Sequence, residues 1–326
     1  MIKKLRFIIL FFIVFLSGCN HEHQKPSEQH FAGKKILYIN SYHKGYSWSD
    51  GIESALKQEI SMTKADLKII RLDTKWKRSE DEKKQAGLMA KQIIEDYQPD
   101  IVIASDDNAA KYVIMPYYRD ADLPFVFCGI NWDVSAYQFP YTNVTGMIEV
   151  EAVQSLVNEL ARYAKGERLG YLGLDALTEH KKVEYSELHM QRHFDKTYFV
   201  NSFEEWKDAF IKMQTEVDIL ILGVQASLSH WDDTEAKAFV MENTKIPTGA
   251  SYDWMIDYAL IGIIKVPEEH GRWSAKTALN ILDGMATSNI PIVHSTEHRV
   301  LVNRQLATKL NIKLSQELLD LVSHFQ

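Results

Sequence analysis

Short apolar runs alternate with longer amphipathic stretches along most of the chain. Four apolar runs, rich in Ile, Val and Phe, are typical of buried strands: 35–40, 67–72, 100–105 and 124–128. Three stretches between them have apolar residues at helical spacing: 49–60, 79–97 and 107–118. This alternation predicts a parallel sheet with crossover helices.

A second series of the same kind follows the first. Its predicted strands are 168–174, 196–201, 218–223 and 247–251. Its predicted helices are 149–163, 181–194, 203–215 and 232–243. Because each series has its own continuous apolar strands, the fold class we expect is α/β, with two doubly wound, Rossmann-like lobes. The run 259–266, a helix at 267–282 and the run 298–303 with its helices complete the sheets.

The N-terminus has the order of a secretion signal. Basic residues at 3, 4 and 6 precede an apolar run at 7–16, which has about half the length of a membrane-spanning helix. The next step, Leu16-Ser17-Gly18-Cys19, resembles the bacterial lipobox, in which the cysteine is lipid-modified and becomes the first mature residue. We therefore expect residues 1–18 to be a lipoprotein signal peptide and Cys19 the lipidation site. An ordinary signal peptide followed by an unmodified thiol is the alternative.

Residues 19–34 are polar and lack periodicity, as in a flexible tether. Removing Lys3, Lys4 and Arg6 from the 37 basic residues leaves 34, against 44 acidic residues, a formal net charge of −10. This charge argues against nucleic acid as a partner. A hydrophobic content of 46% is ample for packed cores. These features predict an extracytoplasmic, membrane-anchored protein, in the periplasm or on the outer face of the cell membrane.

The sequence lacks the usual catalytic motifs. No Gly-x-Gly-x-x-Gly follows the first predicted strand, and no Walker loop, Gly-x-Ser-x-Gly or His-Glu-x-x-His occurs. His189 and His193 are four residues apart on a predicted helix, but two surface histidines are the better interpretation than a metal site. Cys128, in an apolar run, is typical of a small core residue. We therefore expect no catalytic residue, no metal and no cofactor, and rank an enzyme as a distant third possibility.

Aromatic and short polar side chains gather in the turns that follow the predicted strands. Ligands of open α/β sheets bind beyond the carboxyl ends of the strands, where these turns converge. The candidate ligand-binding residues are Ser41, Tyr42, Trp48, Ser105, Asp106, Asp107, Asn131, Trp132, Asp175, Gln225, Tyr252 and Asp253. Together they are suited to stacking a flat ligand between rings and fixing its polar groups. Structural roles are the alternative: the aspartates as helix caps, the tryptophans as cover for the sheets.

Several passages in order carry a family resemblance. They are Ile36-Leu-Tyr-Ile-Asn-Ser41-Tyr, Trp48-Ser-Asp-Gly-Ile-Glu, Pro99-Asp-Ile-Val-Ile-Ala-Ser105-Asp-Asp-Asn-Ala, Pro124-Phe-Val-Phe-Cys-Gly-Ile-Asn131, Asn143-Val-Thr-Gly146, the stretch 271–284 and Arg299-Val-Leu-Val-Asn303-Arg-Gln-Leu-Ala307. From about residue 35 to residue 319 the chain resembles the substrate-binding proteins of ABC transporters of the tryptophan/tyrosine type, in the type 1 periplasmic binding protein superfamily.

The resemblance implies two lobes joined by a hinge and closing on a small molecule in a central cleft. It also implies a discontinuous layout, with residues 35–145 and 259–293 in lobe 1 and residues 146–258 and 294–326 in lobe 2. By position, Ser41, Ser105, Asp106, Asn131, Asp175, Gln225, Tyr252 and Asp253 would line the cleft.

Two functions fit that resemblance. In the first, the protein delivers a small solute, aromatic or amine-bearing, to the membrane permease of an ABC transporter. The second is suggested by the pair Asp106-Asp107 and by Asn40-Ser-Tyr-His43, which resemble extracellular sensor domains of some histidine kinases. In that alternative, closure on the ligand signals to a membrane kinase or cyclase.

Overall fold

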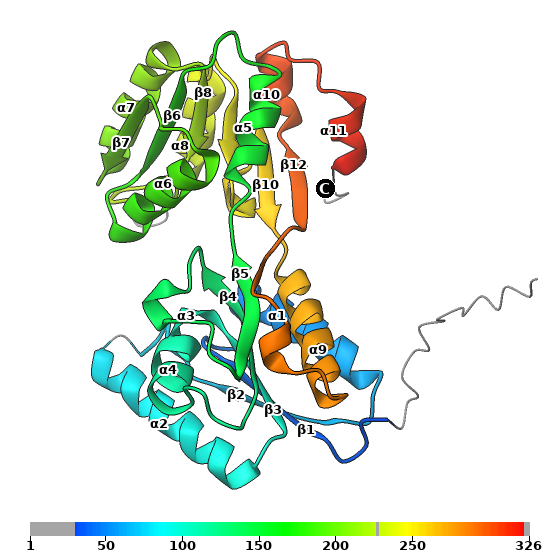
Figure 1. Ribbon diagram of the computed structural model, residues 1–326. Helices are drawn as coiled ribbons and strands as arrows, with labels where there is room; N and C mark the ends of the chain where they lie inside the picture. The colour runs from blue at the N-terminus through cyan, green and yellow to red at the C-terminus, as the bar shows by residue number, and fades with distance from the viewer. Residues whose placement is uncertain (1–29, 78, 226–227, 323–326) are drawn as a thin grey trace, which may run out of the picture.

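The chain folds into two α/β lobes, one above the other in Figure 1. The computed structural model describes residues 30–77, 79–225 and 228–322. The proposed signal peptide, Cys19 and most of the proposed tether lie outside the described residues. Among the residues described, no helix has the length and apolar character needed to span a membrane.

Lobe 1 is built on a six-stranded sheet whose strands are all parallel. Its order is β11 (Val293–His294), β5 (Val144–Glu149), β4 (Phe125–Asn131), β3 (Ile101–Ser105), β1 (Lys35–Asn40) and β2 (Asp66–Arg71). Helices α1 (Ser47–Ser61) and α9 (Pro267–Leu282) bury one face of this sheet, and α2 (Glu80–Tyr97) helps to cover the other. Both faces are thus covered, which explains the continuous apolar runs of its central strands.

The helix predicted at 107–118 is interrupted. It consists of α3 (Asp106–Ala109), a π-helical segment (Ala110–Ile114) and α4 (Met115–Tyr117). Helix α2 packs directly against the π-helical segment, where a Cβ on Gly87 would lie 2.2 Å from the backbone oxygen of Tyr112. Asp106 therefore sits at the junction between β3 and an irregular helix, the kind of place where π-bulges often mark functional sites.

Lobe 2 is built on a second six-stranded sheet. Its order is β12 (His298–Val302), β10 (Ile261–Lys265), β9 (Thr248–Ala250), β8 (Ile219–Leu222), β6 (Leu169–Leu174) and β7 (Lys196–Val200). Only β12 pairs antiparallel with its neighbour in this sheet. The surrounding helices are α5 (Val153–Ala161), α6 (Leu177–Met190), α7 (Phe203–Glu216), α8 (Asp233–Asn243), α10 (Arg304–Lys309) and α11 (Gln316–Leu321).

Three short connections join the lobes (Figure 1). They run from β5 to α5, from β10 to α9 and from β11 to β12. The first and third are hydrogen-bonded to each other, because the Val150 amide donates to Ser295 Oγ at 3.3 Å. The expected fold class, two doubly wound α/β lobes, is confirmed.

Two sequence-based boundaries are wrong. The run 259–266 was expected in lobe 1, but β10 pairs with β9 and β12 and belongs to the sheet of lobe 2. The helix predicted at 149–163 begins only at Val153, because Val144–Glu149 form β5 and extend lobe 1 beyond residue 145. Both errors fall on the strands that lead into the connections between the lobes.

Candidate functional site

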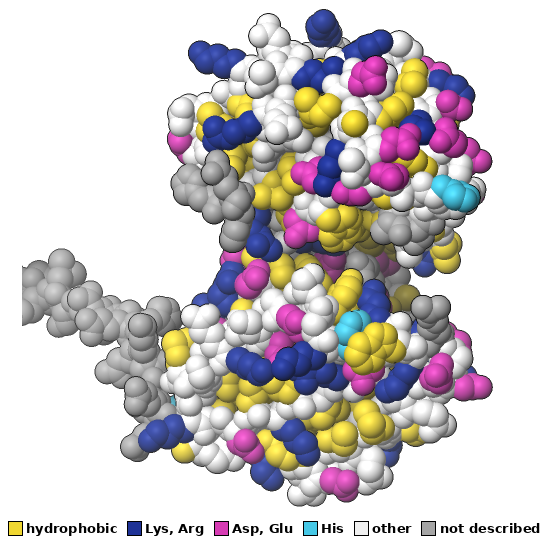
Figure 2. Space-filling view, turned by 180° about the vertical axis from the view of Figure 1, so that it is seen from behind, with side chains coloured by type: hydrophobic (Ala, Val, Ile, Leu, Met, Phe, Trp, Pro, Cys, Tyr) yellow, Lys and Arg dark blue, Asp and Glu magenta, His cyan; other side chains and the backbone are white. Residues whose placement is uncertain are grey.

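The carboxyl ends of the two sheets face each other across the waist of the molecule. Strand β5 leaves lobe 1 at its carboxyl end and β10 leaves lobe 2 at its carboxyl end, and the other strands of each sheet, except β12, run in the same direction. The turns after the strands of both lobes therefore meet at the waist, which Figure 2 shows from behind. This is where open α/β sheets bind ligands.

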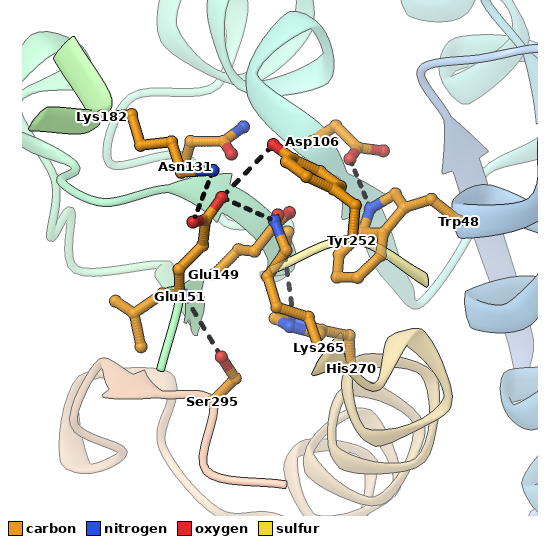
Figure 3. Close-up of polar contacts among 12 residues, drawn as sticks. Trp48, Asp106, Asn131, Glu149, Glu151, Lys182, Tyr252, Lys265, His270 and Ser295 are labelled. Atoms are coloured by element: carbon orange, nitrogen blue, oxygen red, sulfur yellow. Dashed lines mark hydrogen bonds and ion pairs between the residues drawn. The ribbon is translucent and has the colours of Figure 1, made fainter. Parts of the chain in front are cut away.

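A buried group of charges forms the floor between the lobes. It consists of Glu149 and Glu151 at the first connection, Lys265 at the end of β10 and Lys182 on α6 (Figure 3). Lys182 Nζ lies 3.0 Å from Glu151 Oε2, and Lys265 Nζ contacts Glu149 and lies 3.9 Å from Glu151 Oε1. We call these four residues the hinge ion group.

Opposite charges within the hinge ion group counteract the effect of burial on its members. Burial raises the pKa of Glu149, although the ammonium of Lys265 opposes that shift. Burial also acts on Glu151, but Lys182 and Lys265 outweigh it and lower the pKa of that carboxyl. The two carboxylates outweigh burial at Lys265 and raise its pKa. Two acids and two bases thus balance at the floor.

Aromatic rings from both lobes flank Lys265. Tyr252, in the loop after β9, donates its hydroxyl to Glu151 Oε1 at 3.3 Å. Its ring centroid lies 4.5 Å from Lys182 Nζ and 5.7 Å from Lys265 Nζ. On the other side, the ring of Trp48 from α1 lies 5.3 Å from Lys265 Nζ. The faces of both rings are thus placed to attract cations.

Asp106 is the most unusual member of the site. It is 2% exposed, has a φ of 69° and accepts a 3.0 Å hydrogen bond from Trp48 Nε1 on Oδ1 (Figure 3). Its Oδ2 is buried without a hydrogen-bond partner. Burial, with Glu149 and Asp107 nearby, raises its pKa well above the usual range, although Ser105 and Trp48 oppose the shift.

The neutral side chain of His270 packs beside the Trp48 ring that binds Asp106. His270 on α9 accepts a hydrogen bond from the Gly129 amide on Nδ1, and its ring lies 5.3 Å from the Trp48 ring. Burial, assisted by Lys265, lowers the pKa of His270 to about 3, so the ring is neutral at physiological pH. Gly129 itself has a φ of 71°, and a Cβ there would lie 3.1 Å from Asp106 Oδ1. Glycine thus lets this strand approach the carboxylate closely.

Three candidates from the sequence use their polar groups inside lobe 1. Ser41 Oγ donates to the Ser105 carbonyl at 2.5 Å and accepts from the Ala109 amide at 2.9 Å. Ser105 Oγ accepts from the Tyr38 hydroxyl at 3.0 Å. Asp107 accepts from Asn131 Nδ2 at 2.7 Å and from the Tyr137 hydroxyl at 2.6 Å. Ser41, Ser105 and Asp107 therefore brace the turns after β1, β3 and β4.

Trp132 connects the lobes by stacking. It lies after β4, and its ring stacks on Tyr185 at 5.7 Å and on His189 at 6.0 Å, both of which belong to α6. Tyr42, after β1, packs edge-on against Tyr46 at 5.1 Å. Burial and the carboxylates of Asp106, Asp107 and Glu149 raise the pKa of Tyr42, so this ring faces the acidic part of the site.

The remaining candidates lie in the turns of lobe 2. Gln225 is 5% exposed, and its Oε1 has no hydrogen-bond partner. Asp175 is exposed and lies 2.8 Å from His180 Nε2, within its own lobe. Asp253 is exposed and accepts from the Trp254 amide, and Trp254 stacks on Tyr252 at 4.5 Å. Of these residues, only Tyr252 has a contact with the hinge ion group.

Sequence reasoning missed the hinge ion group and His270. The sequence contained a signal for two members of the hinge ion group, because Glu149 and Lys265 are charged residues at the ends of otherwise apolar strands. Two surface hollows, of about 750 and 320 Å³, lie elsewhere. Their walls come from α10, α11 and the amino ends of lobe 2 strands, and neither includes a residue of the floor.

Solved structures share this architecture. A ligand-free, open substrate-binding protein with adhesive properties from Clostridium difficile has a TM-score of 0.71 at 16% identity, covering 90% of this chain and 99% of that one. An ABC domain in complex with L-Trp from Streptococcus pneumonia scores 0.55 at 18% identity, covering 89% and 98%. A 5-methylthioribose transporter solute-binding protein from Thermotoga lettingae scores 0.51 at 11% identity, covering 91% and 93%. The fold is that of ABC-transporter solute-binding proteins.

These identities establish the fold and nothing finer. No protein-family model and no curated protein matches the chain. The neighbours with the solute-binding fold were solved with ligands as different as L-Trp and 5-methylthioribose. Ligand choice therefore depends on the side chains of each cleft.

Proposed function

We propose that this chain is the lipid-anchored, extracytoplasmic receptor of an ABC transporter, capturing a small solute between its lobes and delivering it to a membrane permease. The observation that supports this most is the site at the waist. Strand ends of both lobes meet there, and Trp48 from one lobe and Tyr252 from the other flank the same charged floor. A ligand that contacts both lobes favours the closed arrangement by its differential affinity.

The aromatic lining favours a solute with a flat apolar group. Trp48, Tyr42 and Tyr252 surround the acidic part of the floor, and Trp254 extends the Tyr252 surface. Stacking on such rings binds planar groups with little loss of side-chain entropy. The signalling alternative has no support from the neighbours, and we do not propose it.

Capture is tested on protein purified from its own host. We expect native mass spectrometry to show a co-purified small molecule. When this molecule is added back to stripped protein, we expect the tryptophan fluorescence to change and the radius of gyration in X-ray scattering to fall as the lobes close. Protein that carries no small molecule and stays open with every solute offered would contradict the receptor function. Chemical conversion of the bound molecule would instead indicate an enzyme.

Anchoring is tested at Cys19. We expect wild-type protein to incorporate labelled fatty acid in its host, and Cys19→Ser to lose that label almost completely while the purified domain retains its melting temperature. Cys128→Ala is the matched control, because Cys128 is buried in lobe 1 and is expected to leave labelling unchanged. Full labelling of Cys19→Ser would rule out the lipid anchor at this position.

A further inference from the structure

The site has a buried acceptor that lacks a donor. Asp106 Oδ2 makes no hydrogen bond, although Oδ1 of the same carboxylate is held by Trp48. An unpaired buried carboxylate oxygen is costly, and native structures normally satisfy such atoms. Gln225 Oε1, in a turn of the opposite lobe, is a second buried acceptor without a partner. Each of these oxygen atoms can accept a hydrogen bond from an N–H or O–H group of a ligand.

The charges around Asp106 are unbalanced toward the negative. Four carboxyl groups lie at the floor and beside it: Asp106, Asp107, Glu149 and Glu151, and the pKa values of Asp106 and Glu149 are raised. Two ammonium groups, those of Lys182 and Lys265, face them, and His270 is neutral. The excess of acid disfavours an anionic ligand and favours a cationic one.

Both lysines of the floor are paired with glutamates, and Lys182 Nζ, although it lies 3.0 Å from Glu151 Oε2, makes no hydrogen bond within the described part of the chain. Lys265 contacts Glu149 and Glu151, and Lys182 contacts Glu151. Their ammonium groups also lie over the rings of Trp48 and Tyr252. A ligand carboxylate would have to break these buried pairs, which is strongly unfavourable.

We propose that the ligand is an organic ammonium ion that carries a flat apolar group and no carboxylate. This inference rests on the proposed function and names its substrate class. The ammonium donates to Asp106 Oδ2, and the flat group stacks among Trp48, Tyr42 and Tyr252. Asp106 is 2% exposed, and the half-buried Trp48 is hydrogen-bonded to the same carboxylate, so the ammonium reaches Oδ2 when the indole ring shifts while remaining beside the ligand.

The alternative to an amine is an amino acid, whose carboxylate would need a cation, and Lys75 is the candidate. It is exposed at the rim, and its Nζ lies 4.4 Å from the Tyr42 ring centroid and 4.8 Å from that of Tyr46. An amino acid bound with its amine at Asp106 would place its carboxylate near such a cation. A comparison of each amine with its amino acid therefore separates the two ligand classes.

The experiment uses tyramine against tyrosine and tryptamine against tryptophan, titrated by calorimetry into the folded full-length mature protein at pH 7. We expect at least one amine to bind, about 10-fold or more tighter than its amino acid. We expect Asp106→Asn to weaken that binding about 10- to 100-fold, the usual range for a hydrogen bond to a charged group. Asp283→Asn is the control, because Asp283 is exposed at the end of α9 and pairs with His30. It should bind as the wild type does.

Three results would overturn the inference. If an amino acid binds as tightly as its amine, the ligand can carry a carboxylate, and the proposed restriction to amines is wrong. Equal affinities of wild type and Asp106→Asn would remove the ammonium from this carboxylate. If neither amine binds and the co-purified molecule that closes the lobes is not an organic amine, the ligand class is wrong but the receptor function stands. If that molecule is also absent and the lobes never close, the receptor function fails as well.

Discussion

Replacing Glu151 with glutamine is expected to lower the free energy of unfolding by about 3–5 kcal/mol, the usual cost of removing one partner from a buried ion pair. The Glu151 side chain is 5% exposed and Lys182, 3.0 Å away, is 4% exposed. Glutamine preserves the shape but leaves the Lys182 ammonium buried without an opposite charge. Urea denaturation at pH 7, followed by circular dichroism, measures the change.

Two further variants show whether the effect comes from the buried pair. Glu204→Gln removes the surface ion pair with Lys207, and since Glu204 is 81% exposed we expect a change within about 0.5 kcal/mol. The double variant Glu151→Gln with Lys182→Met removes both charges, and we expect it to recover much of the lost stability. A loss below about 1 kcal/mol for Glu151→Gln would show that water or another group reaches Lys182.

The lobes were predictable because their central strands are buried on both faces. Runs such as Ile101–Ser105 and Ile219–Leu222 are almost wholly apolar and are read directly as strands. Strand β5 was missed, because Thr145 and Gly146 interrupt its apolar character. Gly146 is required there, since a Cβ would lie 2.4 Å from Phe127 Cγ on the neighbouring strand. The sequence of a strand that contains such a glycine does not identify it as a strand unless the neighbouring strand is known.

The site was predictable in position and less so in detail. The strand-end rule led to Trp48, Asp106 and Tyr252, which the structure brings to one floor, and their ligand contacts remain a prediction. The same rule led to Ser41 and Ser105, whose hydroxyls are used inside lobe 1. A short polar side chain after a strand can bind neighbouring backbone or a ligand, and the sequence does not distinguish these roles.

The hinge ion group could not be predicted, because its members are distant in sequence. Lys182 lies on α6, Lys265 ends β10, Glu149 ends β5 and Glu151 follows it. The lobes bring them together only because the chain crosses between the sheets three times. The hinge ion group lies where the chain crosses between the lobes. The same four residues therefore contribute to the free energy of unfolding and border the proposed ligand site.

Asp106 should therefore reduce the stability of the protein when no ligand is added. Burial, Glu149 and Asp107 raise its folded-state pKa, whereas the unfolded value is about 3.9. Between these two values the folded state holds the extra proton, so the stability contributed by Asp106 is full below about pH 4 and is lost as the pH rises.

At pH 7 we expect Asp106→Asn to increase the free energy of unfolding by about 0.5–2 kcal/mol, and to give no gain below about pH 4. Asparagine tolerates the positive φ and retains an oxygen for Trp48 Nε1, so the charge is the main change. Glu149 also has a raised pKa and interacts with Asp106, so the difference between the two proteins reports the coupled pair. Urea denaturation at pH 4, 5.5 and 7 measures the difference, with Asp283→Asn as the exposed control. If Asp106→Asn increases the free energy of unfolding equally at all three pH values, or lowers it at pH 7, the buried carboxyl of Asp106 does not destabilise the ligand-free protein.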